Sequence, residues 1–299
     1  MSKTSMDLKQ ALALIKPTFL GVLIYHCLPF RKKVLMQNLN IAFGKELSQK
    51  DIERIAKGFY SHVVRGFFEN FSMSWISIDK LKARIEVRGI ENLMRAAEKK
   101  KGVLLLTGHL GNWEMSPIAG ILHFQQFRGR LHVLRRHLVN KRIEKILFNR
   151  YYAVGLDVIP KKNSLNNVMQ SLENNDTVAF IMDQYSRPGK EGVEVPFFGR
   201  KAGTFKSLAV VARSSGAPIL PTASWREPNG KHVMSIGEPI EWKEDDDPDK
   251  ELYQNTLNFN HILEQFIRQH PDQWLWIHKR WKYKAPPIRK RKVKKPLPS

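Results

Sequence analysis

Residues 103–114, with the sequence VLLLTGHLGNWE, decide the fold that this chain is expected to adopt. The apolar run 103–106 has the length of a buried strand. Gly108 and Gly111 follow it, and glycine lets the backbone turn sharply and approach a ligand closely. His109 lies in this turn. Because ligands bind at the carboxyl ends of strands in open α/β sheets, the turn is a candidate functional site.

A helix is expected to begin directly after the turn. Asn112 is a favoured N-cap residue, and this start would place Glu114 in the first helical turn. Histidine is well suited to accept a proton near neutral pH, and a carboxylate on its other ring nitrogen fixes its tautomer. His109 and Glu114 are therefore a candidate catalytic pair that would activate a substrate hydroxyl. A core histidine with a helix-capping glutamate explains the same two residues equally well.

Strand and helix patterns alternate on both sides of this stretch. Apolar runs predict strands at 85–88, 131–135, 157–160, 177–182, 219–224 and 232–236. Helical patterns are expected at 90–100, 141–152, 165–174, 204–215 and 250–269. The alternation predicts an α/β domain over residues 81–284, with a mostly parallel central sheet flanked by helices.

Residues 1–80 are expected to form a helical, membrane-associated region. Segment 11–30 is the most apolar part of the chain and approaches the length of a membrane span, but Lys16 and Pro17 interrupt it. We favour a helix in the membrane interface, with the basic residues 31–33 at the level of the lipid phosphates. A true span and an ordinary buried helix are the alternatives.

Two more helices are expected before the first strand. One covers 33–44, and Ser48 is expected to cap the other. The second helix carries several aromatic residues, which we expect in the core, with a hydrocarbon groove as the alternative: Phe67, Phe68, Phe71 and Trp75.

The charge of the chain indicates an anionic partner. Fifty Lys and Arg residues stand against 28 Asp and Glu, a net charge of +22, which suits nucleic acid, an anionic membrane or an acidic carrier protein.

The single cysteine, Cys27, excludes an intrachain disulfide. Residues 285–299 form a basic tail that is expected to be disordered. No His, Cys and carboxylate grouping has metal-ligand spacing, so no metal site is predicted.

Several ordered motifs point to one family. HLGNWE at 109–114 is an H-x4-E motif of the kind found in glycerolipid acyltransferases. With its flanks it resembles the bacterial lipid A biosynthesis acyltransferase family, which adds secondary acyl chains to a lipid A precursor. Further blocks match in order between roughly residues 31 and 282: Asp183-Gln184, VPFFG at 195–199, GAP at 216–218 and PDQWLWIHKRWK at 271–282.

The resemblance implies an O-acyltransferase without a cofactor. The donor would be an acyl thioester of acyl carrier protein or of coenzyme A, and the acceptor a hydroxyl of a phosphorylated lipid A precursor. His109 would remove the proton of that hydroxyl, and Glu114 would orient His109. Backbone amides at the expected helix start, residues 111–113, would stabilise the tetrahedral oxyanion.

The matching blocks also supply candidate substrate-binding residues. By this resemblance, Arg150 and Arg136 would bind a phosphate of the acceptor or the donor. Asp183 ends a buried strand at the same sheet edge as His109, where it would orient an arginine or a phosphate-bearing sugar, or cap the next turn. Phe197 and Phe198, followed by Gly199 in the same block, would wall a hydrocarbon pocket or pack in the core.

The implied location is the cytoplasmic face of the inner membrane, with acyl carrier protein and anionic lipids as partners. The tryptophans Trp274, Trp276 and Trp281 alternate with basic residues, a mixture that suits a membrane interface. One alternative is an acyltransferase of the same superfamily acting on a lysophospholipid or an aminolipid. A nucleic-acid-binding protein is the distant alternative, and it leaves the ordered motifs unexplained.

Overall fold

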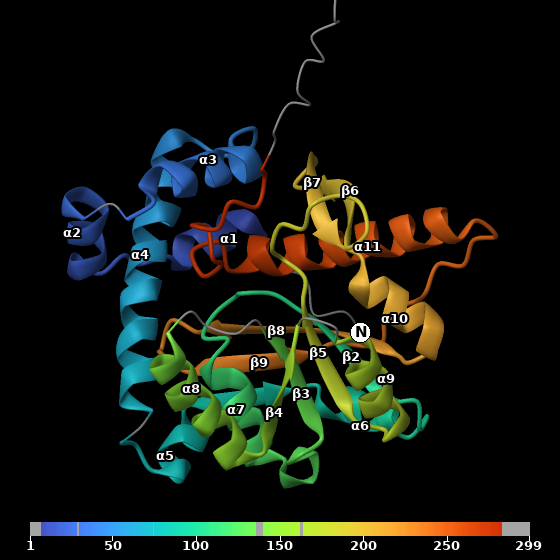
Figure 1. Cartoon of the computed structure of the whole chain (residues 1–299). Helices are drawn as coiled ribbons and strands as arrows, with labels where there is room; N and C mark the ends of the chain where they lie inside the picture. The colour runs from blue at the N-terminus through green and yellow to red at the C-terminus, as the bar shows by residue number, and fades with distance from the viewer. Residues whose placement is uncertain (1–6, 29, 74, 136–139, 162–163, 283–299) are drawn as a thin grey trace, which may run out of the picture.

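The computed structural model describes residues 7–28, 30–73, 75–135, 140–161 and 164–282 (Figure 1). At its centre is a seven-stranded sheet with the strand order β1-β9-β8-β2-β5-β3-β4. These strands are β1 (Ile85–Arg88), β2 (Val103–Thr107), β3 (Leu131–Arg135), β4 (Leu156–Pro160), β5 (Thr177–Ile181), β8 (Ile219–Arg226) and β9 (His232–Ile236). Only the β8–β9 pairing is antiparallel, so the predicted mostly parallel sheet is confirmed.

The motif strand β2 lies in the middle of the sheet, between β8 and β5. Its side chains alternate between two hydrophobic cores, with Leu104 and Leu106 on one face and Val103 and Leu105 on the other. All four are almost fully buried. A strand that is covered on both faces has a continuous run of apolar residues, which is why β2 could be predicted from the sequence.

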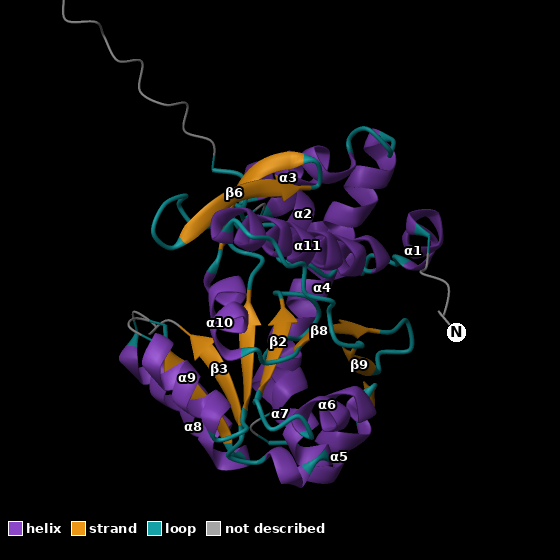
Figure 2. Ribbon diagram, turned by 90° about the vertical axis from the view of Figure 1, so that its right-hand side faces the viewer, coloured by secondary structure: helices purple, strands orange, loops and turns teal. Residues whose placement is uncertain are grey.

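Helices cover both faces of the sheet (Figure 2). One face packs against α5 (Ile78–Ala83), α6 (Ile90–Ala97), α7 (Met115–His123) and α8 (Lys141–Val154). A short 3₁₀ turn, Gln125–Phe127, follows α7. The core on the other face includes side chains of α9 (Leu165–Glu173), α10 (Ser207–Ser215) and α11 (Pro248–Gln269). The sheet thus forms the middle layer, and its carboxyl edge points toward α11 (Figure 2).

The N-terminal helices share the core on the α11 side. They are α1 (Leu8–Leu14), α2 (Phe19–Cys27), α3 (Lys32–Phe43) and α4 (Gln49–Ser72). Ser48 caps α4, as predicted, by accepting a hydrogen bond from the Asp51 amide. The single helix expected over 11–30 is wrong, because α1 and α2 meet at an angle of 101°. Pro17 between them disfavours a helical conformation at Lys16.

No single described helix is both long and apolar enough to cross a bilayer. The bent pair α1 and α2 passes the same length and hydropathy test when its two helices are taken together.

The aromatic residues of the second half of α4 and its end are not in the core. Phe67, Phe68, Phe71 and Trp75 are 67%, 59%, 60% and 69% exposed. Their helical spacing gives them a common face, but the spacing alone does not determine whether another element covers that face. The core prediction for these four side chains is therefore wrong.

A β-hairpin replaces the start of the helix predicted at 204–215. Strands β6 (Gly192–Phe197) and β7 (Arg200–Phe205) pair antiparallel, and α10 begins only after them, at Ser207. Phe198 and Gly199 form the two-residue connection, with φ values of 49° and 68°. Two consecutive left-handed residues are the geometry of a tight hairpin turn. Phenylalanine gives little sequence signal for this conformation, since it rarely adopts a positive φ.

Candidate active site

The ends of two neighbouring strands place His109 and Asp183 at one sheet edge. Thr107 of β2 pairs in register with Ile181 of β5. His109 lies two residues after Thr107, and Asp183 lies two residues after Ile181. The expectation that the two residues share this edge is confirmed. Asp183 is 2% exposed, and the His109 side chain is 15% exposed.

Asp183 binds His109 through both of its oxygens. His109 Nδ1 lies 2.9 Å from Asp183 Oδ1, and the His109 amide donates to Oδ2 at 2.8 Å. The indole N–H of Trp274 also donates to Oδ2, at 2.7 Å. Because an ionised carboxylate only accepts hydrogen bonds, neutral His109 carries its proton on Nδ1. Its Nε2 is then a proton acceptor, and it accepts a hydrogen bond from the side-chain nitrogen of Gln184 at 3.3 Å.

The electrostatics of the pair favour a protonatable His109. Burial lowers the pKa of His109, but the charge and hydrogen bond of Asp183 outweigh burial, and the pKa lies above its ordinary value of 6.5. Burial raises the pKa of the Asp183 carboxyl, whereas the contacts with His109 and Trp274 lower it, with a net pKa of about 2. Asp183 is therefore ionised at neutral pH and stabilises an imidazolium at position 109.

Glu114 binds different partners from those expected. Arg135 Nη1 lies 3.1 Å from both Glu114 oxygens, and the Tyr151 hydroxyl donates to Oε2. No hydrogen bond or ion pair joins Glu114 to His109 in the described part of the chain; the charge of Glu114 only helps to raise the pKa of His109. The expected contact is therefore corrected to His109–Asp183. One reason is that α7 begins at Met115, two residues later than predicted.

Asn112 still helps to start α7, although it is not the N-cap residue. Its side-chain oxygen accepts from the Met115 amide at 3.1 Å. The residues between them form a turn that carries Glu114 away from His109, toward the end of β3 and α8.

Arg135 and Tyr151 are site residues that the sequence reasoning missed. Arg135 ends a correctly predicted strand, so its place at the carboxyl edge was a usable signal. The residue predicted from the sequence is the neighbouring Arg136, which lies outside the described residues. Tyr151 lies in a predicted helix and carried no separate signal. Burial and the charge of Glu114 raise the pKa of Tyr151, which keeps its hydroxyl protonated as a donor.

A buried network holds the turn from behind. Arg226 donates to both oxygens of Glu69, at 2.9 and 2.6 Å, and to His62 Nδ1 at 2.8 Å. Since arginine only donates, His62 Nδ1 must accept, so His62 carries its proton on Nε2 and donates to the Gly111 carbonyl at 3.2 Å. Burial and the Arg226 charge lower the pKa of His62 to about 3. Glu69 also accepts from the Asn112 side chain at 3.1 Å.

The C-terminal block 271–282 is part of this site, and its largest side chains are mostly buried. Trp274, Trp276 and Arg280 are at most 1% exposed, so the membrane-interface prediction is wrong for Trp274 and Trp276. The block runs along the motif turn: Leu275 donates to the His109 carbonyl. The Gly111 amide, one of the expected oxyanion donors, is already bonded to the Gln273 carbonyl at 3.1 Å.

Other predicted site residues lie away from His109. Arg150 lies on α8 and donates to the Asn70 carbonyl of α4 at 3.2 Å. Phe197 and Phe198 pack in the core against Trp276, Trp281 and neighbouring rings, and Gly199 lies in the exposed hairpin turn. None of these four residues lines the cavity at His109.

Two adjoining cavities meet at the site. The first, of about 240 Å³, contains His109, Glu114, Arg135, Tyr151 and Gln184 in its walls. The second, of about 600 Å³, is mainly apolar. Five residues line both cavities, which makes the cavities neighbours: Leu134, Lys161, Phe180, Phe205 and Ser207.

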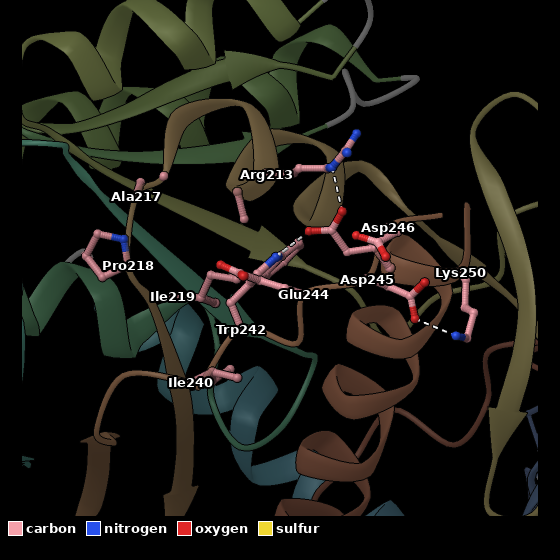
Figure 3. Close-up of a pocket in the computed structure, with 13 residues that line it drawn as sticks. Arg213, Ala217, Pro218, Ile219, Ile240, Trp242, Glu244, Asp245, Asp246 and Lys250 are labelled. Carbon is pink, nitrogen blue, oxygen red and sulfur yellow. Dashed lines mark hydrogen bonds and ion pairs between the residues drawn. The ribbon is translucent and has the colours of Figure 1, made fainter. Parts of the chain in front are cut away.

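A cavity of about 860 Å³ lies elsewhere, near the start of β8 (Figure 3). Several of its polar groups bind one another: Glu251 accepts from Arg213 at 2.7 Å and from the Trp242 indole at 2.6 Å, and Lys250 pairs with Asp245 at 2.6 Å. It shares no lining residue with the His109 cavity, so it is separate from the candidate active site.

Comparison with known proteins identifies the family of the chain. The profile of the bacterial lipid A biosynthesis acyltransferase family matches residues 11–283. The chain belongs to this family. The lipid A biosynthesis lauroyltransferase of Escherichia coli (strain K12) is 27% identical over 265 residues, which are 88% of this chain and 83% of that protein. The palmitoleoyltransferase of the same strain is 25% identical over 270 residues, which are 89% and 83% of the two chains.

A phosphatidylinositol mannoside acyltransferase of Mycolicibacterium smegmatis is also similar, at 23% identity over 66% of this chain and 64% of that protein. The family match and these relatives identify the chain as an O-acyltransferase.

Proposed function

We propose that the chain transfers a fatty acyl group from a thioester to a hydroxyl of a phosphorylated lipid A precursor. His109 is the general base, and Asp183 is the carboxylate that orients it. The hydrogen bond from His109 Nδ1 to Asp183 carries this proposal, because it leaves Nε2 as a proton acceptor at the wall of a cavity. The names of the Escherichia coli relatives support lipid A as the acceptor class.

The reaction is a direct transfer. The acceptor oxygen attacks the thioester carbonyl carbon as its proton passes to His109 Nε2. The tetrahedral intermediate then collapses, the carbon–sulfur bond breaks, and the thiolate takes the proton from the imidazolium. The products are an ester and a free thiol. A positioned general base typically contributes about 10²–10⁴-fold to such a rate.

Glu114 acts indirectly in this mechanism. It fixes Arg135 and Tyr151 at the cavity wall and adds negative charge near His109. Arg135 and Lys161 line the same cavity, and their charges suit a phosphate of the acceptor. The Gln184 side chain and the amides of Asn112 and Trp113 are the proposed oxyanion donors, in place of the Gly111 amide.

The adjoining apolar cavity is the proposed site of the acyl chain. Its apolar walls come from Val168, Phe180 and Val211 among others, and Lys190 and Lys206 also line it. Apolar walls suit a hydrocarbon, and the lysines suit an anionic donor such as acyl carrier protein or coenzyme A. No resident cofactor or metal enters the mechanism.

We further propose that the protein works at the cytoplasmic face of the inner membrane. The acceptor of the proposed reaction is a lipid, and the net charge of +22 favours adhesion to an anionic surface. An acyltransferase acting on another lipid, such as a lysophospholipid or aminolipid, is the second candidate. The similarity to a phosphatidylinositol mannoside acyltransferase favours including glycosylated phospholipids in that group.

A transfer assay in detergent tests the proposal. Radiolabelled acyl groups on acyl carrier protein or coenzyme A are offered with a phosphorylated lipid A precursor or with a lysophospholipid. We expect transfer to the lipid A precursor by the wild type and a loss of about 10²-fold or more in folded His109→Ala. Wild-type turnover by folded His109→Ala would reject the base. Transfer only to the lysophospholipid would reject the acceptor.

A further inference from the structure

Exposed apolar side chains gather on one side of the molecule. Phe67, Phe68, Phe71 and Trp75, here called the α4 stripe, are each more than half exposed. They touch one another: the rings of Phe67 and Phe71 stack with centroids 6.5 Å apart, and those of Phe71 and Trp75 lie 4.5 Å apart. Ile78, at the start of α5, is 59% exposed. The stripe is a contiguous surface rather than a set of scattered side chains, and such surfaces commonly mark interaction sites.

Helix α2 lies beside the first half of α4 and not beside the second half (Figure 1). It begins against Ser61, whose hydroxyl accepts from the Thr18 amide at 2.9 Å. Ser61 precedes Phe68 by about two helical turns. Helix α2 adds its own exposed apolar side chains, with Phe19 85% and Leu23 43% exposed. Both α2 and the second half of α4 therefore expose apolar side chains.

Charged residues flank these apolar segments. In the sequence, exposed Arg65 precedes the stripe on α4, exposed Arg31 and Lys33 follow α2, and exposed Lys80 and Arg84 follow the stripe. Asp79 is the exposed acid beside Lys80. Aromatic side chains at headgroup depth with Lys and Arg near the phosphates are typical of proteins that lie in an anionic membrane interface.

The opposite side of α4 reaches the catalytic turn. Glu69 accepts from Asn112, and the Asn70 carbonyl accepts from Arg150 of α8, the helix that also carries Tyr151. A helix with its side chains is about 10–12 Å across. The stripe therefore lies about one helix width from the turn that holds His109 and Glu114.

We propose that the α4 stripe, together with the exposed apolar side chains of α2, inserts into the interface of an anionic bilayer and holds the His109 cavity beside the lipid surface. The occupant is lipid and not a second protein, because exposed cations flank the apolar segments in the sequence and the chain carries a charge of +22. The inference deepens the proposed function, since a lipid acceptor must reach His109 from a membrane.

Depth labelling of the full chain tests the insertion. Cys27 is the single cysteine, so a Cys27→Ser background allows one new label site. An environment-sensitive fluorophore is placed by Phe71→Cys in the stripe, or by Met94→Cys on α6 as the control, where Met94 is 47% exposed. With vesicles of phosphatidylethanolamine and phosphatidylglycerol, we expect a blue shift and protection from a water-soluble quencher only at position 71. Equal behaviour at both positions would overturn the proposal.

A binding measurement gives an independent readout. The stripe variant carries Phe67→Ser and Phe71→Ser together, and the control variant carries Met94→Ser and Tyr253→Ser. All four positions are exposed. In vesicle co-sedimentation at 0.5 M salt, where screening weakens the basic residues, we expect the stripe variant to bind at least about 10-fold more weakly than the control. Turnover in detergent should be equal in both variants, which separates failed docking from failed catalysis.

Two results would overturn the docking surface. One is unchanged vesicle affinity in the stripe variant. The other is a dimer of the wild type without vesicles, seen by light scattering, that the stripe substitutions convert to a monomer; a second copy of the chain would then be the occupant.

Discussion

At the scale of single residues, two carboxylates near one histidine have different roles because their surroundings differ. Asp183 is almost fully buried and shares hydrogen bonds with His109 and Trp274. Glu114 is paired with Arg135 and hydrogen-bonded to Tyr151. A short sequence motif contains only one of these carboxylates. The pairing depends on which side chains meet across the sheet edge.

The tryptophan that binds Asp183 provides a stability prediction. Trp274→Phe keeps a buried ring but removes a donor to an ionised carboxylate, which costs about 1.5–3 kcal/mol of unfolding free energy. Trp276→Phe is the matched control, because its indole donates to the neutral Pro271 carbonyl and its loss costs about 1 kcal/mol. Urea unfolding of both variants measures the difference. A smaller loss in Trp274→Phe than in Trp276→Phe would contradict the charged hydrogen bond.

At the scale of elements, α4 holds the motif turn through the Glu69–Arg226–His62 network. Glu69→Gln leaves Arg226, whose side chain is 5% exposed, without its charged partner. Breaking a buried pair in this way costs about 3–5 kcal/mol of unfolding free energy. Glu46→Gln is the control, since its pair with Arg268 at 2.7 Å lies near the surface and contributes less than about 1 kcal/mol.

Denaturant unfolding distinguishes the two variants. Losses of similar size in Glu69→Gln and Glu46→Gln would show that the network behind the turn is no more important than a surface ion pair.

The elements show how far the sequence predicts this fold. The strands of the large sheet lie within about two residues of the predicted ranges, because buried strands read as apolar runs. The hairpin β6–β7 was missed, since Phe198-Gly199 is not a typical turn pair. In the site, His109 and the edge position of Asp183 were predictable. The partners of Glu114 were not, because Arg135 and Tyr151 reach it from other elements.

At the scale of the whole molecule, the excess of basic residues should strengthen binding to anionic membranes and should not affect the catalytic step. Residues 289–299 hold Lys and Arg without an acid. Their removal should leave turnover in detergent close to that of the wild type and weaken binding to anionic vesicles, mainly at low salt. Vesicle co-sedimentation and the detergent assay measure the two effects. Lost turnover in detergent would contradict this separation and would favour a binding role for the tail.

The pH dependence of kcat/KM tests the central claim most directly, because it reports the pKa of the free enzyme's base. His109 must be neutral to act, so the rate should rise with pH through a His109 pKa above 6.5. Removing the Asp183 charge lowers that pKa. In Asp183→Asn we therefore expect the acid limb of the kcat/KM pH profile to move to lower pH. We also expect kcat to fall by about 10²–10⁴-fold.

Glu114→Gln is the matched comparison, since Glu114 reaches His109 only through its charge. Its acid limb should move in the same direction by a smaller amount. An acid limb that stays in place in Asp183→Asn, or that moves further in Glu114→Gln, would contradict the assignment of Asp183 as the partner of His109.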